Sequence, residues 1–341
     1  MRVSVLFFCY NQQAFVREAL QSGLAQDFPE YELVVSDDGS SDGTRQIIDE
    51  MLVAVPAHVS VIRVDSLINQ GLVASFNRAL AASSGDILVG MAGDDISERD
   101  RLSTLVQVFR DRPAVQLVCS NLRKIDAAGQ EMPAARFLPD EGRDYAYPPD
   151  GPTRSLYAEL PMVGATAAYR RSIFDIFGPL GPDAPSEDNC LAVRALLLGP
   201  AVYLGDRLVR WRRHGANLST HEFEANGFAR AQIRHLAEYL RASQTALQIE
   251  ADLHAPALAG RVSPKVLRAV GVCARRHGGR QLLRHRSLTP SSWADWTAAL
   301  GRLAWRDRLT TAPLMFLRWA LPPCRWLYWK LLARKLNRRP R

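Results

Sequence analysis

Residues 32–44 read ELVVSDDGSSDGT, an apolar run that gives way at once to acids, serines and glycines. The run from Glu32 to Val35 predicts a buried strand, and the SDDGSSDG that follows predicts a turn. Asp42 stands where a side chain can cap the helix that we expect to begin near Thr44. This stretch alone therefore predicts a strand, a polar loop and a helix in succession.

The same succession recurs on both sides of this stretch. Further strands are predicted over 3–9, 58–64 and 86–91. Helical patterns begin near Gln12, near Val73 and after Ser97, whose spacing to Asp100 is that of a capping box. Strands that alternate with helices predict an α/β fold, in which helices cover both faces of a mostly parallel central sheet.

The composition is that of a globular protein. A length of 341 residues corresponds to about two domains, and 47% hydrophobic with 23% charged residues argue against a disordered or collagen-like chain. The five cysteines stand singly, which argues against a disulfide framework or zinc ribbon and favours a reducing cytosol. The apolar start, residues 1–9, is too short for a secretory signal.

Charge is divided unevenly along the chain. Residues 261–341 hold 19 Lys and Arg against two acids, a net charge of +17, whereas residues 1–260 carry a net charge of −9. Such a basic block predicts an anionic partner: a membrane surface, a nucleic acid or an anionic substrate. Because six tryptophans are interleaved with the arginines, we favour helices lying on an anionic membrane surface and expect no nucleic acid. A solvated basic helical cap is the alternative.

The most apolar part of this block, residues 311–333, is not expected to cross the membrane. It contains Arg318, Arg325, Lys330 and a Pro-Pro pair. Each charge inside a bilayer costs about 2.5–3.5 kcal/mol on insertion scales.

Polar side chains follow three of the predicted strands. Tyr10 and Asn11 come after the first, Asp37 and Asp38 after the second, and the run Gly93–Asp94–Asp95 after the fourth. Ligands of open parallel sheets bind beyond the carboxyl ends of the strands. Gathered carboxylates repel one another unless a cation or hydrogen-bond donors compensate. The clusters predict a nucleotide whose base and ribose meet Asp38, and Mg²⁺ or Mn²⁺ near Asp95.

Each cluster also has a simpler explanation. DDGSSDG can be only a turn with a helix N-cap, and a GDD triplet also occurs in polymerases and in ordinary loops. The order of the clusters, each after an apolar strand, favours the binding site.

Taken together, these motifs resemble those of the GT-A glycosyltransferases of family 2, inverting enzymes that use nucleotide-diphosphate sugars. The resemblance spans about residues 1–220. The matching segments are VSVLFFCYN (3–11), ELVVSDDGSSDGT (32–44), NQGLVASFNRALAASSGDILVGMAGDD (69–95), MVGATAAYRRSIFDIFGPLG (162–181), SEDNCLAVR (186–194) and WRRHGANLS (211–219). The resemblance implies a GT-A fold, followed here by a helical, basic C-terminal extension.

For the donor, the resemblance implies a nucleotide site made of Tyr10, Asn11, Asp38 and Asp94, with Tyr10 near the base and Asp94 near the ribose. Asp95 would hold Mn²⁺ or Mg²⁺. The first acid of the family's DXD metal motif is replaced by Ala92, which leaves the strength and identity of metal binding open.

For the chemistry, the resemblance implies that Asp188 is the general base and that Glu187 lies beside the acceptor or orients a neighbour. His214 matches the histidine of the family's YRxH segment and would bind the metal or the pyrophosphate. The alternatives are that Glu187 and Asp188 merely begin a helix, where acids are favoured, and that His214 is an ordinary surface residue. In one interpretation Arg212 or Arg213 reaches a phosphate, and in the other both are merely solvated.

The resulting prediction is an inverting transfer of a sugar from a UDP or dTDP donor to a glycan or lipid-linked acceptor, in assembly of a bacterial surface polysaccharide. We expect residues 1–125 to form the nucleotide-sugar half of the GT-A domain and 126–220, with a long surface loop over 126–160, the acceptor half. Residues 221–341, helical at least over 221–255, would hold the protein at the cytoplasmic face of the cell membrane.

Two other functions remain open at the level of sequence. A catalytically degenerate nucleotide-sugar-binding protein is consistent with the loss of the first metal-motif acid. A nucleotidyltransferase would show a glycine-rich phosphate loop after the first strand, where this chain reads CYNQQAF. An NAD-dependent dehydrogenase is disfavoured because the first turn lacks GxGxxG.

Overall fold

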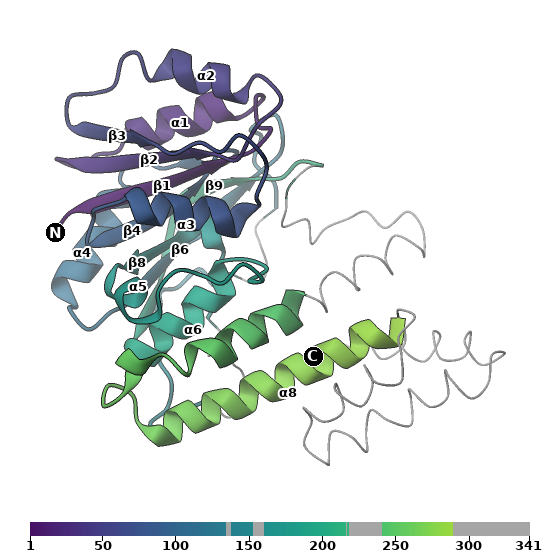
Figure 1. Ribbon diagram of the computed structural model, residues 1–341. Helices are drawn as coiled ribbons and strands as arrows, with labels where there is room; N and C mark the ends of the chain where they lie inside the picture. Colours follow the sequence, from purple (N-terminus) through teal and green to yellow (C-terminus); the bar gives the residue numbers. More distant parts are fainter. Residues whose placement is uncertain (134–137, 153–159, 216, 218–240, 289–341) are drawn as a thin grey trace. The chain divides into compact units, whose positions relative to one another are not determined.

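The protein is described by a computed structural model that covers residues 1–133, 138–152, 160–215, 217 and 241–288 (Figure 1). The chain divides into two compact units. The first contains residues 1–224 and 248–273, and the second contains residues 225–247 and 274–341.

The first unit is built on one sheet, which has nine strands in the part of the chain that the structure describes. They are β1 (Val3–Cys9), β2 (Tyr31–Asp37), β3 (Val59–Arg63), β4 (Ile87–Ala92), β5 (Ile96–Ser97), β6 (Leu117–Ile125), β7 (Arg143–Tyr145), β8 (Ala167–Arg170) and β9 (Ala201–Arg212). Their order in the sheet is β3-β2-β1-β4-β8-β6-β9-β5, and β7 pairs with β9.

The sheet is parallel in its first half and mixed in its second. Strands β3, β2, β1 and β4 are parallel neighbours, joined by crossover helices as predicted. Strand β8 is antiparallel to both β4 and β6, while β6 and β9 are again parallel. The predicted α/β fold is confirmed, and the antiparallel β8 at its centre is an addition that the strand-helix alternation did not reveal.

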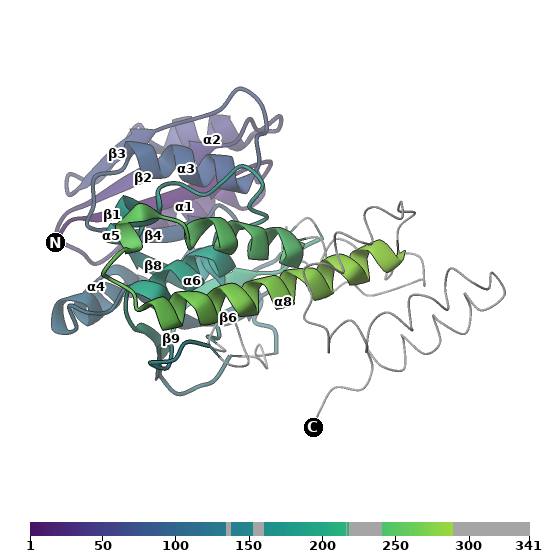
Figure 2. The ribbon, with the colours of Figure 1, turned by 60° about the horizontal axis from the view of Figure 1, so that its bottom comes forward.

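Helices cover both faces of this sheet. The described α-helices of the first unit are α1 (Val16–Leu24), α2 (Thr44–Met51), α3 (Leu72–Ala82), α4 (Arg101–Asp111), α5 (Ser172–Phe177) and α6 (Asp188–Leu198). Alternate side chains of β1 belong to two hydrophobic cores, one on each face of the sheet. Val5 belongs to the core with α1, α2 and α4, and Leu6 to the core with α3, α5 and α6. The α6 side comes forward in Figure 2. The predicted three layers are therefore present.

Two local predictions are corrected. Ser97 is not a helix cap: it lies in β5, and its hydroxyl accepts a hydrogen bond from the Arg101 guanidinium at 2.8 Å. The predicted loop over 126–160 contains the short strand β7.

Most of the described C-terminal part is helical. Residues 241–252 are helical, and so is α8 (Pro264–Leu288). Residues 218–240 and 289–341, which include the 311–333 segment and most of the basic, Trp-rich block, lie outside the described residues. No helix in the described portion is both long and apolar enough to cross a membrane.

Candidate functional site

The polar clusters predicted after β1, β2 and β4 lie at one edge of the sheet. Parallel register places Cys9 beside Asp37 and Phe8 beside Ala92, so the three strands end together. The residues that follow them are therefore neighbours, as the sequence predicted. This edge is the candidate site.

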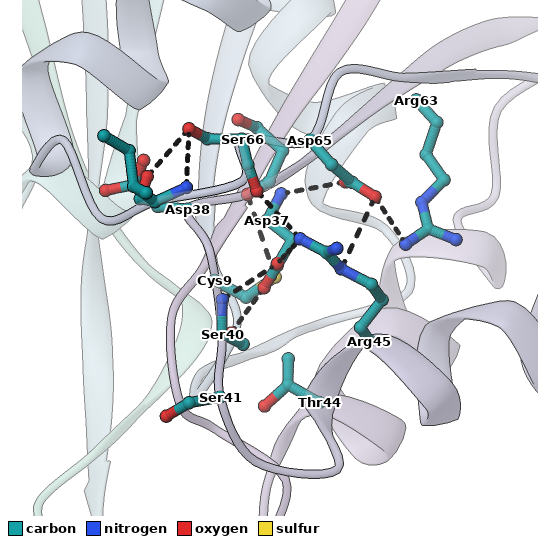
Figure 3. A network of polar contacts seen from close by, with 12 residues as sticks. Cys9, Asp37, Asp38, Ser40, Ser41, Thr44, Arg45, Arg63, Asp65 and Ser66 are labelled. Carbon is teal, nitrogen blue, oxygen red and sulfur yellow. Dashed lines mark hydrogen bonds and ion pairs between the residues drawn. The ribbon is translucent and has the colours of Figure 1, made fainter.

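The loop after β2 is held by a network of charges, drawn in Figure 3. Asp37 is fully buried and accepts hydrogen bonds from the Ser40 amide and hydroxyl and, at 2.9 Å, from Arg45. Arg45 also approaches Asp65, which follows β3 and binds Arg63 at 2.7 Å. The network fixes the loop to the neighbouring strand through alternating charges.

Gly39 is required in this loop. Its φ is +76°, a left-handed conformation that favours glycine. A Cβ atom there would lie 2.5 Å from the backbone of Ile68. The close approach of two backbones after β2 and β3 therefore depends on this glycine.

Asp38 serves the start of α3. Its Oδ2 accepts hydrogen bonds from the amides of Gln70 (3.1 Å) and Gly71 (2.7 Å), and its Oδ1 accepts one from Arg78 (3.0 Å). Both carboxylate oxygens of this buried residue are thus engaged within the protein. Its predicted contact with a nucleotide base stays a prediction; in the structure it binds the backbone amides of the two residues that precede α3.

Tyr10 and Asn11 lie on the open side of the same loop. Asn11 adopts φ +50°, its amide donates to Ser40 Oγ at 2.9 Å, and its Oδ1 accepts from the Ser41 amide at 2.8 Å. Tyr10 is 42% exposed, which leaves its ring available to a ligand. Asn11 therefore ties the β1 loop to the β2 loop beside an exposed aromatic face.

Asp94, after β4, meets His214 from the segment after β9. Asp94 Oδ2 lies 2.9 Å from His214 Nε2 and accepts a hydrogen bond from Asn217 at 3.0 Å. The His214 ring packs against Phe15, with the ring centroids 4.6 Å apart. Two candidate residues 120 positions apart in the sequence are thus brought into contact.

Asp95 has a different environment from its neighbour. It is buried, and its Oδ1 accepts a hydrogen bond from the Arg212 amide at 2.8 Å. Burial, followed by the negative charge of Asp94, raises the pKa of Asp95 well above its ordinary value. The carboxylate that meets the His214 imidazole is therefore that of Asp94, and metal binding by Asp95 stays a prediction.

Arg212 is not solvated. Its side chain is 2% exposed and donates to the Asp94 carbonyl at 2.9 Å and to Glu18 at 2.5 Å. The guanidinium carbon also lies over the Phe15 ring, 5.1 Å from its centroid. Arg212 therefore binds the end of β4 to the start of α1.

Of the two implied cations, Mn²⁺ fits the donors of Asp94 and His214 better than Mg²⁺ does. A carboxylate and an imidazole face each other at Asp94 and His214, and oxygen with nitrogen donors suits Mn²⁺, while Mg²⁺ prefers oxygen alone. No group of three or more His, Cys, Asp or Glu gathers around a common point among the described residues. These two side chains would thus hold an ion together with the oxygens of a bound diphosphate.

Glu187 and Asp188 mark the start of α6. Asp188 is half-buried, and its Oδ1 accepts hydrogen bonds from Ser186 Oγ and the Asn189 amide, both at 2.7 Å. Glu187 Oε2 is buried without a hydrogen-bond partner in the described part of the chain. Burial, followed by the negative charge of Asp188, raises the pKa of Glu187 to about 8. The Asp188 carboxylate is therefore oriented by two hydrogen bonds, whereas the Glu187 carboxyl group favours its protonated form.

The two acids are linked to the end of β4 through a short 3₁₀ turn, Gly164–Thr166. A Cβ atom on Gly164 would lie 2.5 Å from Glu187 Oε1. The buried Arg101 donates to the carbonyls of Gly90 in β4 (2.8 Å) and Ala165 in the turn (2.7 Å). Burial lowers the pKa of this guanidinium to about 10, against the opposing effect of Asp95. Arg101 thus ties β4, the strand that Asp94 follows, to the turn beside Glu187.

Three residues of the site are not singled out by the sequence motifs as functional. They are Phe15, Arg101 and Asn217, of which only Asn217 lies inside a quoted motif, WRRHGANLS. Their contacts join segments far apart in the chain. The position of Asn217 three residues after His214 was the one available signal.

Comparison with known proteins places this geometry in a family. Residues 4–177 match the sequence profile described as Glycosyl transferase family 2. Over 230 residues the chain is 28% identical to an uncharacterized glycosyltransferase of Nostoc, covering 64% of this chain and 66% of that protein, just under two thirds of its length.

Two solved structures share the fold. Staphylococcus aureus TarS 1–349, in complex with UDP-GlcNAc, has a TM-score of 0.60 at 19% identity and covers 94% of this chain and 88% of that one. The mannosyltransferase PcManGT of Pyrobaculum calidifontis, in complex with GDP-Man and Mn²⁺, has a TM-score of 0.51 at 19% identity, covering 91% and 83%. With half of its length matched by the profile and this fold in common, the chain belongs to glycosyl transferase family 2.

Proposed function

We propose that the protein is an inverting glycosyltransferase that moves a sugar from a nucleotide-diphosphate sugar to an acceptor hydroxyl. The observation that carries this proposal is the contact of Asp94 with His214 at the edge where β1, β2 and β4 end. Family membership supports the reaction class, and the exposed ring of Tyr10 beside the same edge supports a nucleotide.

The donor would bind with its base near Tyr10 and Asn11 and its diphosphate near Asp94 and His214. Asp94 and His214 would hold Mn²⁺ or Mg²⁺, which when bound neutralises the negative charge of the leaving nucleoside diphosphate. Asn217 donates to the same oxygen of Asp94 as the imidazole approaches, so it orients that carboxylate. The Mn²⁺ in the complex of PcManGT supports the metal.

Asp188 would take the proton from the acceptor hydroxyl as the hydroxyl oxygen attacks the anomeric carbon. Its Oδ1 is oriented by Ser186 and the Asn189 amide, which leaves Oδ2 to accept the proton. General base catalysis of this kind contributes about 10²–10⁴-fold to the rate. A single displacement inverts the anomeric configuration. Glu187, favoured in its protonated form, would donate a hydrogen bond beside the acceptor.

We further propose a UDP or dTDP donor and a glycan or lipid-linked acceptor of a surface polysaccharide. The UDP-GlcNAc complex of TarS supports a uridine nucleotide. The net charge of +17 over 261–341 and the exposed Arg268 on α8 support binding at the inner face of the membrane.

The decisive test begins with a thermal-shift screen of nucleotide sugars with Mn²⁺, because a donor stabilises only the folded state to which it binds. With the donor found, Asp188→Asn should bind it normally and lower turnover at least about a hundredfold. Asp175→Asn, an exposed acid on α5, is the matched control. Near-normal turnover of Asp188→Asn would remove the assignment of the base.

A catalytically degenerate nucleotide-sugar binder is the second candidate, and the observation that favours it is Ala92 in place of the first acid of the metal motif. Measurement of donor hydrolysis without acceptor, with and without Mn²⁺, separates the two. An active transferase hydrolyses the donor slowly in the presence of metal, and a binder leaves it intact.

A further inference from the structure

We infer that Arg194, Gln248 and Asp252 form a clamp that positions the loop 178–187, and with it the candidate base Asp188. This inference rests on the proposed function. It assigns a role in the active site to a helix that lies beyond the residues matched by the family profile, 4–177.

Arg194 is the centre of the clamp. It lies on α6, six residues after Asp188, and its side chain is 1% exposed. Its Nε and one terminal nitrogen bind the two oxygens of Asp252 at 2.8 and 2.7 Å, a bidentate pair. Asp252 lies in the helical segment 241–252 and is itself buried.

The same guanidinium also binds the start of the loop. It donates to the Gly178 carbonyl at 2.8 Å and to the Pro179 carbonyl at 3.3 Å, and its carbon lies 5.3 Å from the centroid of the Phe177 ring. One side chain on α6 therefore connects the loop that precedes this helix to the distant Asp252.

Gln248 and Asn77 fix the next two residues of the loop. Gln248 Oε1 accepts a hydrogen bond from the Gly181 amide at 2.9 Å, while its Nε2 donates to Asp252 Oδ1 at 2.9 Å. Asn77 on α3 donates to the Leu180 carbonyl at 2.8 Å and accepts from the Leu180 amide at 3.0 Å. Backbone groups of four consecutive residues, 178–181, are thus bound by side chains from outside the loop.

This loop leads directly into the proposed chemistry. It ends at Ser186 and Glu187, and α6 begins at Asp188. The clamp holds the loop before the base and, through Arg194, the helix after it. A base must be held within hydrogen-bond reach of the proton that it removes. The clamp residues touch no reacting group in this proposal, so they act as positioning residues.

The test compares Gln248→Met and Asp252→Asn with the control His254→Ala, an exposed residue just after the same helix. Gln248→Met keeps the approximate volume of the side chain and removes its two hydrogen bonds, to Gly181 and Asp252. This variant therefore still tests the clamp if Asp252→Asn fails to fold. With a donor that the wild-type protein binds, we expect kcat per calorimetrically counted donor site to fall at least about tenfold, with donor Kd nearly unchanged. General destabilisation would lower the number of sites and leave the turnover of each one intact.

A second measurement needs no substrate. Hydrogen exchange of the amides in 180–189 should accelerate at least about tenfold in Gln248→Met, with β1 to β4 unchanged. Wild-type turnover per site together with wild-type exchange would overturn the inference. If the wild-type protein binds no nucleotide sugar, the proposed function fails instead, and the exchange result still decides whether the clamp holds the loop.

Discussion

Asp94 and Asp95 are the same residue type at adjacent positions, yet the structure gives them opposite surroundings. Asp94 directs its carboxylate to His214 and Asn217, whereas Asp95 is enclosed and bound to the Arg212 backbone. The sequence could locate the pair after β4 but could not divide the two roles, because the division depends on where β9 and the segment after it lie.

The division predicts different effects of two substitutions. Asp94→Asn should remove the dependence of nucleotide affinity on Mn²⁺, because an amide is a much poorer ligand than a carboxylate. Asp95→Asn should mainly lower the free energy of unfolding, since its carboxylate is enclosed within the fold. Calorimetric titration with UDP, with and without Mn²⁺, measures the first effect and urea unfolding the second. Metal dependence kept by Asp94→Asn and lost only in Asp95→Asn would reverse the assignment.

Glu187 predicts a pH-dependent stability. Its pKa is raised from 4.5 to about 8, so between these values the folded protein binds a proton that the unfolded chain has released. The free energy of unfolding therefore falls as the pH rises through this interval. Glu187→Gln, which cannot ionise, should be several kcal/mol more stable than wild type at about pH 9 and should lose this advantage near pH 4.5. Urea unfolding at the two pH values measures the difference. An advantage independent of pH would contradict the raised pKa.

At the scale of elements, the sequence predicted what local patterns determine. The strand predicted over 3–9 is β1, and the helix expected near Thr44 begins there, with Asp42 Oδ1 accepting the Thr44 amide at 3.0 Å. The position of the antiparallel β8 between β4 and β6 could not be predicted from the sequence, because tertiary packing decides which strands pair. The solvated alternative for Arg212 is wrong for the same reason, because its partners Glu18 and Asp94 come from distant elements.

Substitution of Asp38 tests how strongly the end of β2 stabilises the turn before α3. Asp38→Ala leaves two amides and Arg78 without their acceptor and should lower the free energy of unfolding by about 1–3 kcal/mol. Asp38→Asn keeps one oxygen for the Gly71 amide and should lose less. Urea unfolding measures both, with Asp175→Ala as the control. If Asp38→Asn folds with nearly wild-type stability but loses affinity for UDP, Asp38 also contributes to nucleotide binding.

At the scale of the whole molecule, the sequence located the candidate site but not all of the chain that builds it. The motifs end near residue 220, whereas residues 248–273 belong to the first compact unit together with 1–224. The buried pair of Arg194 with Asp252 is one reason, because removal of Asp252 would leave a buried guanidinium without its counter-charge. No sequence motif predicts this ion pair, because its two residues lie 58 positions apart.

Because residues 248–273 belong to the first unit, a truncation that tests the membrane prediction must fall after them. A chain cut after residue 278 keeps residues 248–273 and loses 14 of the 19 basic residues of the 261–341 block, together with both of its acids. Because attraction to anionic lipid is worth about 1 kcal/mol per basic residue near the surface, we expect the full chain to sediment with vesicles containing phosphatidylserine and the shortened chain to stay in solution. Added salt should release the full chain, since surface electrostatics are screened within a Debye length. Unchanged thermal unfolding with UDP and Mn²⁺ shows that the shortened chain has kept its site. Equal sedimentation of the two chains at low salt would reject a membrane role for residues 279–341.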